Sequence, residues 1–132
     1  MNSFEELFAW QSAQELRISF SIIAKLFLAE EKFRLTDKII LSSRSIFANI
    51  TEGFGRFNHQ DNILFCRMAR GSLYETLEHL ICALDKKYIS EKVVIEQKEI
   101  FATCLKILNG YIAYLKKAKL EKDSIIQRNL TT

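Results

Sequence analysis

Two histidines and three cysteines are the side chains of this sequence best suited to metal chemistry. His79 and Cys82 are three residues apart, so a helix would place them on one face, where Cys104 could approach them. Two or three soft ligands are too few for a zinc site. A di-iron bundle needs Glu-x-x-His twice, but Thr76 stands three residues before His79, and His59 falls in an expected turn. We therefore expect no metal and no cofactor.

Other enzyme signatures also fail. The segment G-F-G-R, residues 53–56, lacks the spacing of a phosphate-binding loop and follows an expected helix rather than a strand. Two histidines support no Ser-His-Asp or Cys-His arrangement. The three cysteines (Cys66, Cys82 and Cys104) have no paired spacing and lie in apolar helical contexts, which is typical of buried reduced thiols. The sequence predicts a protein that is not an enzyme.

A stripe of polar residues is the more informative pattern. Steps of three or four residues connect the members of this stripe, so they lie on one face of a helix. A second row, Ser72, Glu75 and His79, follows on the next expected helix. One interpretation is a solvated face. The other, favoured by the small serines, is a partly buried hydrogen-bond network that fixes helix register or a subunit contact. The first stripe consists of Lys38, Ser42, Ser45, Asn49, Glu52 and Arg56, and the predicted network of Ser45, Asn49, Glu52, Ser72 and Glu75.

The basic residues point to a second kind of site. Residues 34–70 contain six basic and three acidic side chains, a net charge of +3 that equals the net charge of the whole chain. The arginines of this segment either form ordinary surface ion pairs or contact the phosphates of RNA or DNA. No RNA-recognition motif with stacking aromatics is present, and the tyrosines are expected in the core or at its rim. The predicted nucleic-acid contacts are Arg44, Arg56, Arg67 and Arg70.

These side chains must be positioned by helices. Hydrophobic residues make up 48% of the chain, proline is absent, and apolar residues recur at helical spacing. Ser3, Thr36, Asn58 and Ser90 precede the four periodic stretches and are expected to cap them. The expected helices run from Ser3 to about Glu30, from Thr36 to about Phe54, from about His59 to Lys86, and from Ser90 to about Lys119.

The four glycines modify this pattern. Gly53 and Gly55 are expected to end the second helix in the left-handed conformation that glycine adopts at little steric cost. Gly71 and Gly110 lie inside helices, where glycine costs about 1 kcal/mol relative to alanine. We expect the close approach of another helix to compensate for that cost.

Helices joined by short connections predict an all-α, up-down-up-down four-helix bundle. The bundle is expected to span residues 1–120 as one domain, and residues 121–132 to form a frayed or disordered tail because the apolar pattern fades there. The longest apolar stretch, residues 18–29, contains Lys25 and is too short to span a bilayer. No signal peptide is visible, so we expect a cytoplasmic protein without a membrane partner.

Three segments resemble a known family: L-T-D-K-I, R-S-I-F-A-N-I-T-E-G-F-G-R and M-A-R-G-S-L-Y-E-T-L. They are similar to four-helix-bundle proteins encoded in intervening sequences of bacterial 23S rRNA genes. That family looks related to accessory variability determinants of diversity-generating retroelements, which partner a reverse transcriptase. The resemblance covers about Trp10 to Leu115, and it contains the residues of the predicted polar network. Phe47 stands where the family usually has proline.

The resemblance implies a homopentameric barrel of bundles. Apolar residues beyond one internal stripe, namely Leu41, Ala48 and Phe57, also favour self-association. A pentamer of subunits charged +3 would carry about +15, enough to attract nucleic acid. The first functional hypothesis is thus an accessory protein that binds RNA or DNA electrostatically. The others are a protein-interaction subunit, for example of a retroelement reverse transcriptase, and a structural oligomer without a nucleic-acid role.

Overall fold

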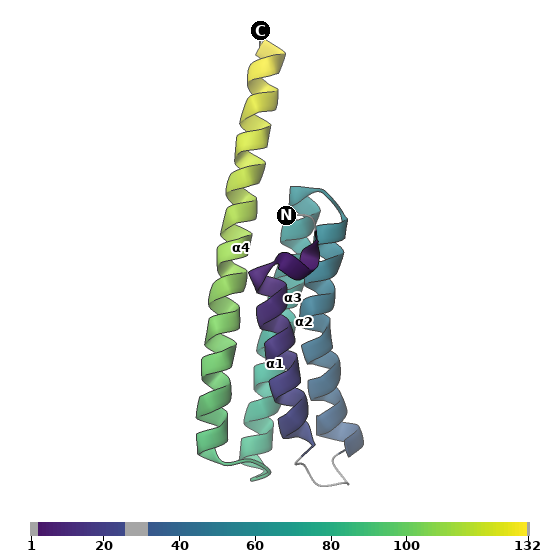
Figure 1. Ribbon diagram of the computed structural model, residues 1–132, viewed down its shortest axis with the longest axis vertical. Coiled ribbons are helices and arrows are strands. Elements are labelled where there is room, and N and C mark those ends of the chain that lie inside the picture. Colours follow the sequence, from purple (N-terminus) through teal and green to yellow (C-terminus); the bar gives the residue numbers. More distant parts are fainter. Residues whose placement is uncertain (1–2, 26–31, 132) are drawn as a thin grey trace.

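The computed structural model describes residues 3–25 and 32–131, and within them every regular element is a helix. The four long helices alternate in direction and lie side by side (Figure 1). α1 and α3 each pack against both α2 and α4, which closes the up-down-up-down four-helix bundle predicted from the sequence. The elements are η1 (Phe4–Glu6), α1 (Phe8–Ala24), the π-helical turn η3 (Lys32–Thr36), α2 (Asp37–Gly55), α3 (His59–Asp85) and α4 (Glu91–Thr131).

The core is formed by the predicted apolar stripes. Residues at helical spacing on each helix turn inward, and burial of each large side chain contributes about 1.5 to 3 kcal/mol. The row Val94, Phe101, Leu108 and Leu115 on α4 is buried throughout, whereas Tyr114, expected on the same face, is exposed. The fully buried large side chains include Leu16, Phe20, Ile39, Ile46, Ile50, Leu73, Leu80 and Leu108.

The N-terminal region begins differently from the prediction. Ser3 accepts a hydrogen bond from the Glu5 backbone N–H at 3.2 Å and so caps the short helix η1. Leu7 then adopts an extended conformation, with ψ at 125°, so α1 begins only at Phe8. The expected end of this helix near Glu30 lies outside the described residues.

Two of the predicted caps at the later helices are confirmed and one is wrong. Asn58 accepts from the Asp61 backbone N–H at 3.1 Å, and Ser90 accepts from that of Val93 at 3.3 Å. Thr36 does not cap α2, because η3 runs directly into α2 and Thr36 already has helical dihedral angles. Its hydroxyl instead donates to the carbonyl oxygen of Ala24 at 3.3 Å, which ties the end of α1 to the start of α2.

The glycine predictions need correction. No described glycine has a positive φ; the left-handed residue after α2 is Phe57, with φ at 55°. Gly53 is a packing glycine, because a Cβ there would lie 2.7 Å from Asn62 Oδ1 and 3.1 Å from the Asn62 carbonyl oxygen. Gly71 and Gly110 were expected to be close-packed, but both are exposed, and a Cβ on either would meet no atom of the described chain within 4 Å.

The C-terminal tail was predicted to be frayed or disordered over residues 121–132. α4 is helical to Thr131, and it extends well past the α2–α3 turn (Figure 1). Residues 120–130 are exposed, so bundle packing does not hold this part in place. Local factors favour the helix: the segment lacks glycine and proline, and Lys119 pairs with Asp123 one turn later at 3.0 Å. None of the described helices is long and apolar enough to cross a membrane.

Candidate functional site: a polar seam and a basic flank

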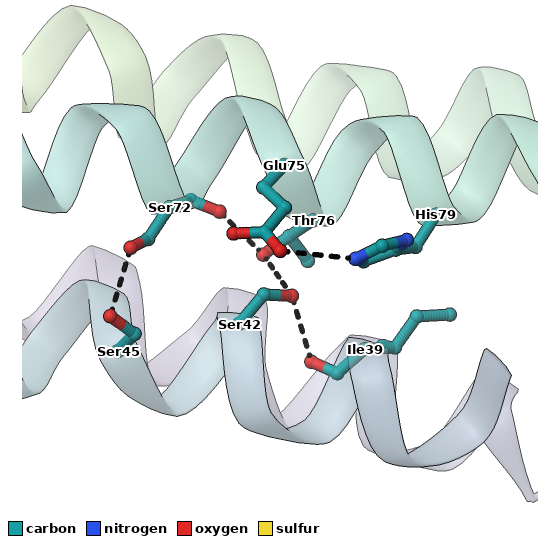
Figure 2. Close-up of polar contacts among 7 residues, drawn as sticks. All are labelled: Ile39, Ser42, Ser45, Ser72, Glu75, Thr76 and His79. Carbon is teal, nitrogen blue, oxygen red and sulfur yellow. Dashed lines mark hydrogen bonds and ion pairs between the residues drawn. The ribbon is translucent and has the colours of Figure 1, made fainter. Parts of the chain in front are cut away.

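A partly buried line of small polar residues lies between α2 and α3, and we call it the polar seam. The Ser45 and Ser72 hydroxyls are 2.9 Å apart, and those of Ser42 and Thr76 are 2.8 Å apart (Figure 2). Asn49 Nδ2 donates to the carbonyl oxygen of Ser45 at 2.8 Å and to its hydroxyl at 3.1 Å. The seam thus links the two helices by two side-chain hydrogen bonds, one helical turn apart.

Thr76 has the most buried polar side chain of the seam, with a relative exposure of 0%. Its hydroxyl oxygen also lies 2.7 Å from the carbonyl oxygen of Ser72, one turn earlier in α3. Thr76 also donates to Ser42 Oγ, and Ser42 donates in turn to the carbonyl oxygen of Ile39 on α2 at 3.3 Å (Figure 2), so the hydroxyl proton of each residue has an acceptor. Thr76 was not among the predicted network residues, although its position four residues after Ser72 places it on the same face of α3.

The structure brings together only part of the predicted network. Ser45, Asn49 and Ser72 belong to the polar seam, but the two carboxylates do not. Glu52 pairs with Arg56 on its own helix at 2.8 Å, and Glu75 lies 3.4 Å from His79 Nε2 at the exposed edge (Figure 2). Burial of a carboxylate without a cationic partner is costly, so these longer side chains reach solvent instead.

The three cysteines are free, but only two of them are buried as predicted, because Cys82 is partly exposed. Cys66 and Cys104 are buried, and burial raises the pKa of Cys66 to about 12. Burial also raises the pKa of Cys104, against a hydrogen bond from Ser12 that lowers it. A protonated, inaccessible thiol is a poor nucleophile and a poor metal ligand. Within residues 3–25 and 32–131, no three His, Cys, Asp or Glu side chains cluster as a metal site would require.

Basic residues meet on another side of the bundle, where α3 faces α4. Arg67, Lys116 and Lys119 line one open groove of about 420 Å³, and we call these three residues the basic flank. Asp61 is the acidic residue in the same groove lining. Residues 116–131 of α4 contain five basic and two acidic side chains, a net charge of +3. The charge count of residues 34–70 alone did not reveal this part of the basic surface.

The four predicted arginines do not form one cluster. Arg67 belongs to the basic flank, and Arg70, nearby on α3, donates to Asn109 of α4 at 2.9 Å. Arg56 donates twice to Glu52 and lies over the ring of Phe65 at 5.0 Å, so it forms contacts within the protein. Arg44 is exposed on α2. The interpretation as ordinary surface pairing thus describes Arg56, whereas Arg67 lies among other cations.

Fold and side chains together define an antiparallel four-helix bundle with a polar seam inside and a basic groove outside. The family model described as 23S rRNA-intervening sequence protein matches residues 5–110, and the chain belongs to this family. A solved structure of similar fold is a protein of unknown function from the S23 ribosomal protein family of Bacteroides thetaiotaomicron. It has 23% sequence identity and a TM-score of 0.72 over 80% of this chain and 95% of its own. No curated protein matches the sequence.

Proposed function

We propose that this protein is a non-enzymatic, cytoplasmic accessory protein that binds RNA or DNA electrostatically through its basic flank. The observation that carries the proposal is the convergence of Arg67 from α3 with Lys116 and Lys119 from α4 on one open groove. Lysine and arginine side chains in such a groove neutralise phosphates and release counterions, which produces sequence-independent, salt-sensitive binding. The name of the family, which refers to an rRNA intervening sequence, is consistent with a nucleic-acid context.

Self-association is part of the proposal. Large apolar side chains are exposed on several helices, among them Phe8 and Ile22 on α1, Leu41 on α2 and Ile95 on α4. Covering them with further copies of the chain would remove apolar surface from water and repeat the basic flank around the assembly. We propose a homopentamer, for which light scattering would give about five times the 15.4 kDa of the chain. A monomeric particle would contradict this part.

The same exposed apolar side chains favour a second candidate function. A protein-interaction subunit, for instance one that serves a retroelement reverse transcriptase, would use them to bind its partner rather than to bind copies of itself. In that case the protein would be indifferent to nucleic acid, and mixed RNA at low salt would leave the mass of the particle unchanged.

The test of nucleic-acid binding uses two charge-reversed variants in fluorescence anisotropy with single-stranded RNA. Arg67→Glu/Lys116→Glu/Lys119→Glu alters the basic flank. Its matched control, Lys92→Glu/Lys98→Glu/Lys106→Glu, changes the same number of charges at exposed positions elsewhere on α4. We expect a loss of affinity of at least tenfold for the first variant beyond that of the control, together with a weaker dependence on salt. Equal losses in both variants would contradict a localised site.

A further inference from the structure

The turn between α2 and α3 holds a large aromatic side chain in solvent. Phe57 is 89% exposed, and its φ of 55° is a left-handed conformation that bulky residues rarely adopt. Such a conformation is strained, and it persists where its surroundings enforce it, often at binding sites. The Phe57 backbone N–H bonds to the carbonyl oxygen of Phe54 at 3.4 Å, which closes the turn after α2. The chain therefore presents a ring to solvent at an energetic cost.

Aromatic rings from α4 face this turn across a hollow of about 470 Å³, which we call the aromatic hollow. Phe54, Phe57, Tyr111 and Tyr114 all line it. The two tyrosine rings are 6.3 Å apart with an interplanar angle of 15°, and Tyr114 is 63% exposed. The hollow thus offers flat ring faces to a ligand, and its volume is within the range of small-molecule sites.

A polar group at the bottom of the aromatic hollow adds a directional contact. Asn62 Nδ2 donates to the hydroxyl oxygen of Tyr111 at 3.0 Å. The Tyr111 hydroxyl accepts in this bond and keeps its own proton to donate. Burial raises the pKa of Tyr111, with the Asn62 hydrogen bond opposing the rise, so this proton stays on the oxygen at neutral pH. A flat ligand with acceptor atoms on its edge would match the arrangement.

The aromatic hollow is continuous with the basic flank. Phe57 and His59 also line a neighbouring hollow of about 280 Å³, whose lining includes Lys119, Lys122 and Asp123, the ion-pair partner of Lys119. Lys119 in turn belongs to the groove that holds Arg67 and Lys116. A path of adjacent hollows therefore leads from ring faces to cations along the side of α4. Aromatic rings next to a basic groove are the arrangement that binds single-stranded nucleic acid.

We propose that this path binds single-stranded nucleic acid, with an unpaired base stacked in the aromatic hollow and the adjoining phosphates on the basic flank and Lys122. This inference rests on the proposed function and narrows it to one substrate class. A duplex keeps its base faces stacked internally, so it would use the cations without the rings. The tyrosines were predicted to lie in the core or at its rim. Only the folded chain brings Tyr114 close to the α2–α3 turn.

The experiment compares an oligothymidylate of about twelve nucleotides with an abasic strand of equal length and a duplex, each titrated in fluorescence anisotropy. The variant is Phe57→Gly/Tyr114→Ala, in which glycine suits the positive φ and position 114 is exposed, so folding is preserved. Tyr74→Ala, which removes a half-exposed ring on α3 that lines none of these hollows, is the control. We expect wild type to prefer the oligothymidylate over the abasic strand by about tenfold or more.

The double variant is expected to lose that preference while it binds duplex as wild type does and keeps the same salt dependence. Tyr74→Ala is expected to behave as wild type. If wild type binds the oligothymidylate and the abasic strand equally, or the double variant retains the preference, the base-stacking inference is wrong and electrostatic binding still stands. If wild type binds none of the three probes at low salt, the proposed function fails and this inference fails with it.

Discussion

The two sides of α3 differ in the size and kind of residue that they present. Towards α2 the contacts include small residues, namely Gly53 and Ser45 of α2 and Ser72 of α3, and a Cβ at Gly53 would clash with Asn62 of α3. Towards α4 the contacts involve large side chains, such as Tyr74 against Phe101 with ring centroids 5.2 Å apart. Small residues permit close helix approach, whereas large ones at the edge of an interface leave grooves between their ends.

The two sides of α3 therefore have different roles, one in stability and the other in binding. The polar seam on the α2 side is satisfied by its own hydrogen bonds and has little surface left for a ligand. The α4 side has open grooves, with the basic flank in one and exposed rings in another. Variants of the polar seam should therefore change stability, whereas variants of the basic flank should change binding.

The largest change in stability is expected from Thr76→Val, which keeps the shape of the side chain and removes the buried hydroxyl. Loss of the contacts with Ser42 and the Ser72 carbonyl should lower the free energy of unfolding by about 1 to 2 kcal/mol. Thr51→Val is the matched control, because Thr51 bonds only to the Phe47 carbonyl on its own helix. Urea denaturation measures both. Equal losses of unfolding free energy in the two variants would show that the hydrogen bond between α2 and α3 contributes nothing to stability.

Gly53→Ala should follow, with a net destabilisation of about 1 kcal/mol. The added methyl group would lie 3.0 Å from Phe65 Cβ and 3.1 Å from the Asn62 carbonyl oxygen, and the shift that it forces outweighs the better helix propensity of alanine. Gly71→Ala is the opposite case, because its Cβ meets no atom of the described residues within 4 Å. It should stabilise the protein by up to about 1 kcal/mol. Thermal denaturation measures both variants. A shift of both melting temperatures in the same direction would contradict the close α2–α3 packing.

The pH dependence tests the buried centre of the bundle. Burial raises the pKa of Cys66 from 9.0 to about 12, so the folded state keeps a proton that the unfolded state releases above pH 9. Its contribution to stability is complete below pH 9 and is lost as the pH rises towards 12, by roughly 1 kcal/mol per pH unit. Urea midpoints of wild type and Cys66→Ala between pH 8 and pH 10.5 measure this contribution. The urea midpoint of Cys66→Ala should decline less steeply with pH than that of wild type. Parallel declines in the two proteins would exclude a buried thiol at this position.

The smallest effect is expected from removal of the C-terminal extension. Every residue from 120 to 130 is exposed, so a chain that ends at Leu120 should retain its free energy of unfolding within about 0.5 kcal/mol. Nucleic-acid affinity should fall modestly, since Lys122 and Arg128 are lost with the segment. Chemical denaturation and anisotropy on the same samples separate the two effects. A large loss of stability would mean that the extension packs against the folded protein.

Much of the fold could be predicted from local patterns. The helical spacing of residues such as Leu73, Leu80 and Leu108 is a local property, and all three are buried where the stripes placed them. Asn58 and Ser90 cap their helices because a cap needs only the first turn that follows it. The predicted cap at Thr36 was wrong, because a π-helical turn runs directly into α2. A cap requires a non-helical residue before the helix begins.

The site was harder to predict, because its contacts join residues far apart in the sequence. Nothing near Gly53 indicates that Asn62 packs against it, and glycine could equally have ended the helix. The Ser45–Ser72 hydrogen bond depends on the relative rotation of two helices, as does the exclusion of Glu52 and Glu75 from the seam. Tyr114 lies at helical spacing in the apolar pattern of α4, and yet its side chain is exposed. The apolar stripe on this helix is wider than the face that packs against the core.

The most direct test of the central claim is lysine footprinting of wild type with and without single-stranded RNA, read by mass spectrometry. All six lysines compared lie on α4, so local secondary structure is the same for each of them. We predict that RNA protects Lys116, Lys119 and Lys122 from acylation and leaves Lys92, Lys98 and Lys106 reactive. Uniform protection of all six, or protection confined to the second group, would contradict a nucleic-acid site on the basic flank.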